Sequence, residues 1–88
     1  MFRRLMRRRF RAGFGADRVL IVGANEEART IAERLIETGR MEVRGFLDDF
    51  NPVGQEVIRG VRITGVPRDY EQIARREGVN HIILVPGA

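Results

Sequence analysis

The sequence of 88 residues contains no cysteine, tryptophan, serine or lysine, so all sixteen of its basic residues are arginine. Without lysine, the chain has no P-loop phosphate lysine, no Schiff base and no Tyr-Lys redox pair. Without serine or cysteine, it has no Ser-His-Asp or Cys-His nucleophile, and a single histidine does not make a zinc site. We therefore expect no catalysis from this chain, which has the length of one small domain. Two classes of function remain: a binding module, or a part of an enzyme whose catalytic residues lie elsewhere.

The charge is distributed unevenly along the chain. Residues 1–18 hold seven arginines against one acid, a charge of +6, whereas residues 19–88 hold nine arginines against eleven acids, a charge of −2. The basic character therefore belongs to an N-terminal arm, and the remainder is mildly acidic. We divide the chain into an arm and linker over residues 1–17 and a folded module over residues 18–88.

The arm combines its arginines with regularly spaced apolar residues. Phe2, Leu5, Met6 and Phe10 have the spacing of one stripe along a helix. This pattern predicts a basic helix or arm over residues 2–11 that rests on an anionic membrane surface. A plain solvated tail is the second interpretation, and nucleic acid is the least favoured partner. In the arm, arginine interrupts every apolar run and no long apolar region follows, so no secretory signal is expected. No apolar stretch of the chain approaches ~20 residues, so no membrane-spanning segment is expected either.

The rest of the chain alternates between strand and helix patterns. These patterns predict strands at 18–22, 42–47, 61–64 and 81–85, helices at 25–38 and 69–77, and a turn at 51–54. The order is typical of an α/β fold. We expect a partial Rossmann-like, three-layer arrangement, with a short parallel sheet of four strands in the order 3-2-1-4 and a helix on each face.

The first strand, turn and helix form a candidate phosphate-binding segment. In the dinucleotide fingerprint G-x-G-x-x-G, the three glycine positions are occupied here by Gly23, Asn25 and Ala28. Gly23 suits the tight turn, but Asn25 adds a side chain where a pyrophosphate needs bare backbone. If a ligand binds, we expect the backbone from Gly23 through Ala24 and Asn25 to Glu26 to approach its phosphate. The alternative is that the fold keeps this turn for structural reasons and no longer binds a ligand there.

Two acids follow the second predicted strand. Asp48 and Asp49 lie where nucleotide-binding folds place a carboxylate that accepts hydrogen bonds from ribose. Because adjacent residues of an extended chain point to opposite sides, we expect at most one to face a ligand, and we favour Asp48. His81, at the start of the fourth strand, is expected to be a surface or edge residue.

Four segments together resemble a known family. Residues 18–24 (RVLIVGA), 45–49 (GFLDD), 60–65 (GVRITG) and 78–84 (GVNHIIL) follow its order and spacing. They resemble the N-terminal, CoA-binding-like Rossmann domain of bacterial polysaccharide-biosynthesis proteins. Its two branches are membrane-bound nucleoside-diphosphate-sugar epimerases or dehydratases of the capsular type, and undecaprenyl-phosphate sugar-phosphate transferases. In both, the domain follows transmembrane helices through a basic juxtamembrane stretch, which the arm resembles.

The resemblance implies a nucleotide or nucleotide sugar as ligand, NAD(P) as a possible cofactor, and a place at the cytoplasmic face of the membrane. The chain departs from the family in its turn, which reads GANEEA, and in lacking the transmembrane and catalytic parts. It therefore looks like a truncated domain. The nucleotide-sugar-binding module of a sugar acyltransferase, an NAD(P)-binding enzyme domain and a purely structural self-association module are the alternatives.

A short sheet of this kind leaves its fourth strand at an open edge. Residues 82–85 are apolar throughout, and apolar edges invite pairing with another chain. We therefore predict a homo-oligomer, formed by edge-to-edge pairing or through an uncovered face of the sheet.

Overall fold

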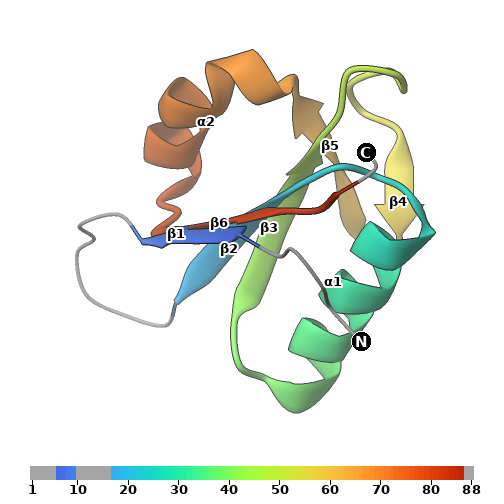
Figure 1. The fold of residues 1–88 in the computed structure, drawn as a ribbon, viewed down its shortest axis with the longest axis vertical. Coiled ribbons are helices and arrows are strands. Elements are labelled where there is room, and N and C mark those ends of the chain that lie inside the picture. The colour runs from blue at the N-terminus through green and yellow to red at the C-terminus, as the bar shows by residue number, and fades with distance from the viewer. Residues whose placement is uncertain (1–5, 10–16, 87–88) are drawn as a thin grey trace.

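A computed structural model describes residues 6–9 and 17–86 of the chain, which form an α/β fold (Figure 1). Six strands build one mixed sheet, and two α-helices and a short 3-10 helix accompany it. Along the chain the elements are β1 (Met6–Arg9), β2 (Arg18–Val22), α1 (Glu26–Thr38), β3 (Glu42–Leu47), β4 (Glu56–Ile58), β5 (Val61–Gly65), η1 (Pro67–Asp69), α2 (Tyr70–Glu77) and β6 (His81–Leu84).

The strands lie in the order β1-β6-β2-β3-β5-β4. The inner strands β6, β2, β3 and β5 are parallel to one another, whereas β1 and β4 are antiparallel to their neighbours. The prediction of a purely parallel sheet of four strands was therefore wrong in its strand count and in the full strand order. The α/β class itself is confirmed.

The first additional strand is β1, which was expected to be helical. Met6–Arg9 pairs antiparallel with β6, with Met6 opposite Leu84 and Arg9 opposite His81. The physical reason is that β6 would otherwise expose a row of unpaired backbone groups, and a short isolated helix is only marginally stable. For these four residues the helix prediction was wrong, and the rest of the arm lies outside the described residues. The edge of β6 is covered by the chain itself, so it is not the open edge that was predicted.

The second additional strand is β4, which forms a hairpin with β5. Ile58 lies opposite Val61, and Gly60 in the connection has a φ of 82°, a conformation that favours glycine. The backbone N–H of Gly60 donates to Glu56 Oε2 at 2.7 Å, so a side chain of β4 also holds the turn. A strand of three residues has too short a pattern to be recognised in the sequence.

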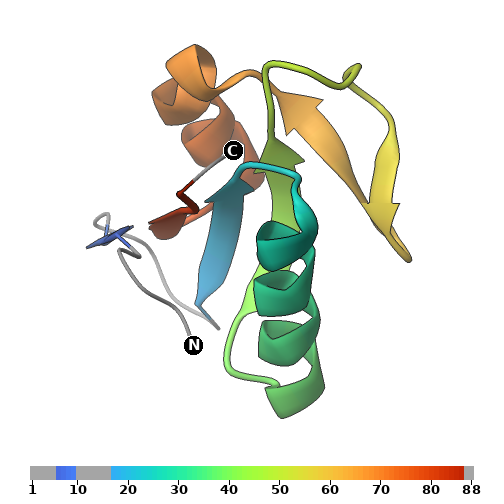
Figure 2. The same ribbon diagram turned by 45° about the vertical axis from the view of Figure 1, so that its right-hand side comes forward.

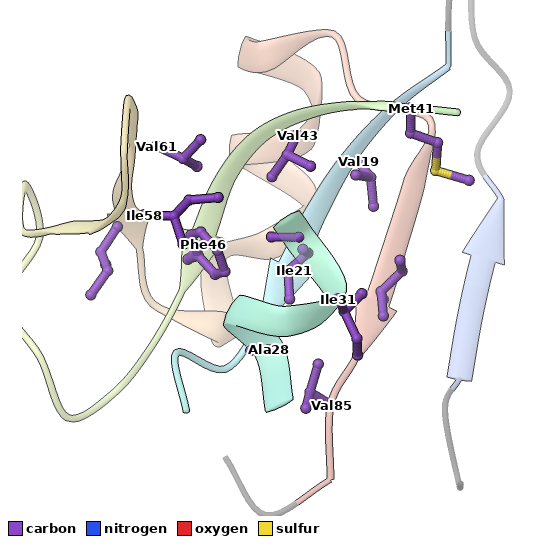
Figure 3. Packing of buried hydrophobic residues seen from close by; sticks show 13 residues of the cluster. Val19, Ile21, Ala28, Ile31, Met41, Val43, Phe46, Ile58, Val61 and Val85 are labelled. Atoms are coloured by element: carbon purple, nitrogen blue, oxygen red, sulfur yellow. The ribbon is translucent and has the colours of Figure 1, made fainter. Parts of the chain in front are cut away.

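Each face of the sheet is covered by one helix (Figure 2). Successive side chains of a strand point to opposite faces, so β2 contributes apolar residues to the core on both faces. On one face, Val19 and Ile21 of β2 pack with the buried stripe of α1, in the larger of the two buried clusters, which Figure 3 shows. On the other face, Leu20 packs with Ile73 of α2. Gly39 and Gly78 are the C-cap residues of α1 and α2, and both adopt the left-handed conformation.

Candidate functional site

A small hollow lies at the carboxyl ends of the parallel strands. It is lined by the last residue of β2, β3 and β6 and by the residues that follow each strand, together with Pro67: residues 22–23, 47–50 and 84–85. From β2 the chain crosses to β3 on one side, and it later returns to β6 on the other side. In open α/β sheets ligands bind in the crevice at such a switch point. The hollow therefore occupies the place where a ligand of this fold is expected.

Gly23 fixes the wall of the hollow that belongs to β2. Its φ of 115° lies in the region that favours glycine. Its backbone N–H donates to the carbonyl of Leu47 at 2.7 Å, and the N–H of Val85 donates to the carbonyl of Val22 at 3.2 Å. The turn is thus tied to the strands on both sides, and Ala24 packs against the α1-side core.

Asn25 serves as the N-cap of α1. Its Oδ1 accepts a hydrogen bond from the backbone N–H of Ala28 at 2.9 Å, and its Nδ2 donates to the carbonyl of Pro86 at 3.4 Å. A cap of this kind satisfies one of the helix amides that would otherwise face an anion. Glu26 is exposed in the first turn of the helix, where its charge suits the helix dipole but repels a phosphate. Both features weaken phosphate binding at this turn.

Asp48 organises the loop that follows β3. Its side chain is buried with the residue 5 % exposed, and Oδ2 accepts hydrogen bonds from Phe50 N (2.9 Å), Asn51 N (2.7 Å) and Asn51 Nδ2 (2.9 Å). Asp49 is exposed. Both acids line the hollow, so the more accessible carboxylate is that of Asp49, although the sequence favoured Asp48.

Apolar residues that the sequence did not single out complete the site. Phe50 is 81 % exposed and lines the hollow beside the two acids. A second hollow on the α2 side is formed by Tyr70 and Ile82, and it shares Val22, Pro67 and Leu84 with the first. Phe50 and Pro67 lie between the predicted elements, Phe50 just before the turn at 51–54 and Pro67 between the strand 61–64 and the helix 69–77, and the sequence gave no signal for a lining role there.

The size of the site limits what it can hold. The two hollows measure about 80 and 120 Å³, whereas pockets for small-molecule ligands usually measure about 300–1,000 Å³. A nucleotide would therefore lie across an open crevice, with much of its surface exposed. Such an arrangement favours weak binding, because little apolar surface is removed from water.

The amino end of the sheet carries a separate polar cluster. His81 is 2 % exposed, and its Nε2 lies 3.3 Å from Asp17 Oδ2. Asn80 accepts from Arg18 N at 2.8 Å and donates to Asp17 Oδ1 at 3.0 Å. The prediction of a surface or edge position for His81 was wrong, because β1 and β2 flank β6. This cluster aligns the starts of β2 and β6, at the end opposite to the hollow. Within the described ranges, no group of His, Asp and Glu side chains could hold a metal ion.

Ion pairs on the surface connect β2, β3 and α2. Glu42 Oε2 accepts from Arg44 at 2.6 Å, and Arg44 also reaches Glu77 at 3.3 Å. The hydrogen bond from Arg44 holds the pKa of Glu42 below its ordinary value, and the bond to Glu42 raises the pKa of Arg44. These pairs are exposed and lie away from the hollow, so we assign them to stability.

No family model, curated protein or solved structure matches this chain. In the part of the chain that the structure describes, no helix has the length and apolar character needed to cross a membrane.

Proposed function

We propose that this chain is a non-catalytic Rossmann-like module of a polysaccharide or nucleotide-sugar biosynthesis protein, and that it binds a nucleotide or nucleotide sugar weakly. The observation that carries the proposal is that the Gly23 turn and the carboxylates of Asp48 and Asp49 line one hollow at the switch point of the sheet. A glycine turn before a helix suits phosphate, and a carboxylate after the neighbouring strand suits ribose hydroxyls.

The binding is proposed to be weak for reasons that lie in the same residues. Asn25 already caps α1, Asp48 already holds its own loop, and the hollow is small. To bind a ligand, the side chains of Asn25 and Asp48 would each have to exchange an internal hydrogen bond for one to the ligand, or share that bond. An internal bond and a ligand bond are similar in strength, so such an exchange gains little free energy.

We propose that the module lies at the inner face of the cytoplasmic membrane. The support is the charge distribution, with +6 on residues 1–18 and −2 on residues 19–88. A basic segment near an anionic leaflet gains about 1 kcal/mol for each basic residue close to the surface. The acidic remainder is repelled by that leaflet, so the arm would be the segment that makes contact.

The test is thermal unfolding of the full chain with NAD, NADP, coenzyme A, UDP and UDP-sugars. A ligand at ten times its Kd stabilises the folded state by about 1.4 kcal/mol, which corresponds to roughly 6–11 °C in a domain of this size. Asp48→Ala and Asp49→Ala are each compared with their own unliganded Tm. A structural loss lowers that Tm, whereas the loss of a ligand contact removes the shift. Glu33→Ala removes an exposed acid in the middle of α1 and is the matched control.

A shift with one class of nucleotide that Asp49→Ala or Asp48→Ala removes and Glu33→Ala retains would support the proposal. No shift with any ligand, from a chain shown to be folded, would refute the ligand and leave a scaffolding role for the module. Binding tight enough to survive gel filtration, with a nicotinamide cofactor, would instead favour an NAD(P)-binding enzyme domain.

A further inference from the structure

β1 is attached to the fold through one neighbouring strand. Its four residues pair antiparallel with β6, from Met6 opposite Leu84 to Arg9 opposite His81, and its other side forms the edge of the sheet (Figure 1). β6 is also paired on its far side with β2, in parallel from Val19 opposite His81. β6 therefore keeps one strand partner whether β1 is present or not.

The connection allows β1 to leave without disturbing β2. Arg9 and Val19 both lie opposite His81, one on each side of β6, so the ends to be joined are about 10 Å apart. The eight residues 10–17 can span up to about 26 Å. Nothing in the reach of the chain requires β1 to stay paired with β6.

The same residues carry a second, incompatible pattern. Met6 belongs to the apolar helical stripe of the arm, and Arg7, Arg8 and Arg9 belong to its charged remainder. In water the strand prevails, because a short helix is marginal and β6 offers backbone partners. At an anionic bilayer, apolar side chains and arginines both gain from a helix lying in the interface. A residue cannot be in β1 and in this helix at once.

We propose that β1 covers the edge of β6 in water and that an anionic bilayer draws β1 away from this edge. The bilayer binds only the released arm, and β6 binds only the paired arm, so each state excludes the other. A ligand shifts a two-state equilibrium by its differential affinity for the two states, and here the whole affinity of the arm for lipid is differential. This inference rests on the membrane contact included in the proposed function.

The test locks β1 onto β6 with a disulfide. Met6→Cys with Leu84→Cys joins two residues that lie opposite each other, and opposite residues of antiparallel strands are about 4.5–5.5 Å apart, within disulfide range. The chain has no other cysteine, so the new bond is unambiguous, and every arginine is retained. The full-length variant is measured, oxidised and reduced, for co-sedimentation with phosphatidylcholine vesicles that contain phosphatidylglycerol. Helical circular dichroism is recorded on the same samples.

We expect the reduced form to bind these vesicles and gain helical signal, and the oxidised form to bind at least about tenfold more weakly without that gain. Met6→Cys alone, treated with the same oxidant, is the matched control and should bind like the reduced form. Vesicles added before the oxidant should slow formation of the disulfide. Equal binding by the oxidised and reduced forms would overturn the inference while leaving the membrane contact intact. A chain that binds no anionic vesicle would overturn both, and a disulfide that never forms would show that β1 does not cover β6.

Discussion

The N-cap of α1 offers the sharpest test of how this turn has been adapted. Asn25→Ala removes the Oδ1 acceptor of the Ala28 amide at 2.9 Å and the Nδ2 donor to the Pro86 carbonyl at 3.4 Å. Loss of an N-cap costs about 0.5–2 kcal/mol, and the long bond to Pro86 adds little. We therefore expect Asn25→Ala to destabilise the protein by about 1 kcal/mol, which lowers the Tm by roughly 4–8 °C.

Asn25→Gly separates the cap from the ligand site. Glycine at an N-cap costs only a few tenths of a kcal/mol, because the exposed helix amides can bind water instead. Asn25 has a φ of −78°, so the position itself does not require glycine. The substitution also brings the turn to the sequence GAG, with bare backbone where a pyrophosphate would lie. We expect a small loss of stability together with a larger stabilisation by nucleotide than in the unmodified chain.

The assay is thermal and urea unfolding of the unmodified chain, Asn25→Ala and Asn25→Gly, with and without the nucleotide that gives the largest shift. Asn25→Asp is the control, because it keeps the Oδ1 acceptor, removes the Nδ2 donor and adds a charge that repels phosphate. The reasoning fails if Asn25→Ala costs no more than Asn25→Gly, since the side chain would then not be a cap. It also fails for the ligand site if Asn25→Gly leaves nucleotide binding unchanged.

Three further substitutions test the packing, the loop and the surface charges. A Cβ on Gly65 would overlap the Cδ1 methyl of the buried Ile73, so Gly65→Ala should cost about 1–3 kcal/mol in urea unfolding, and an unchanged midpoint would show that the Ile73 side chain can turn away without loss. Asp48→Ala removes the oxygen that accepts three hydrogen bonds and should destabilise the protein by about 1–3 kcal/mol. Amide hydrogen exchange should become faster only in the loop after β3, and an equal increase in the exchange rate throughout the protein would contradict a local role. The pKa of Glu42 is lowered from its ordinary 4.5 by Arg44, so the pair stabilises the fold at neutral pH and loses that effect as the pH falls through the lowered pKa. The stability difference between the unmodified chain and Glu42→Gln should accordingly be small at pH 7 and decrease as the pH falls below 4.5, and a difference that grows in acid would reverse the assignment.

The sequence predicted those elements whose pattern is complete within themselves. β3 begins and ends at the predicted residues 42 and 47, and its end is marked because Asp48 and Asp49 directly follow its last apolar residue. The start of α1 followed from Asn25 and the acids of its first turn. β1 could not be predicted, because its conformation depends on the free edge of β6, a feature of the tertiary fold.

The site was predictable in position but not in the use of its side chains. The order of the elements places Gly23 and Asp48 at the carboxyl ends of neighbouring strands, and both residues line the same hollow. The sequence could not show that Asp48 is occupied by the amides of Phe50 and Asn51, since a carboxylate before a turn suits a ligand or the turn equally well. Phe50 gave no signal at all, because an exposed aromatic residue between predicted elements has no pattern around it.

The pairing of β1 with β6 also determines how the module would respond to a mechanical load. Met6 and Leu84 lie opposite each other in antiparallel strands, so tension applied through them pulls the two strands apart from one end. Such a load breaks the backbone hydrogen bonds in sequence, a few at a time, whereas a load along parallel strands must break many at once. The module should therefore yield first by peeling β1 from its edge at low force, while β2, β3 and both helices keep their packing.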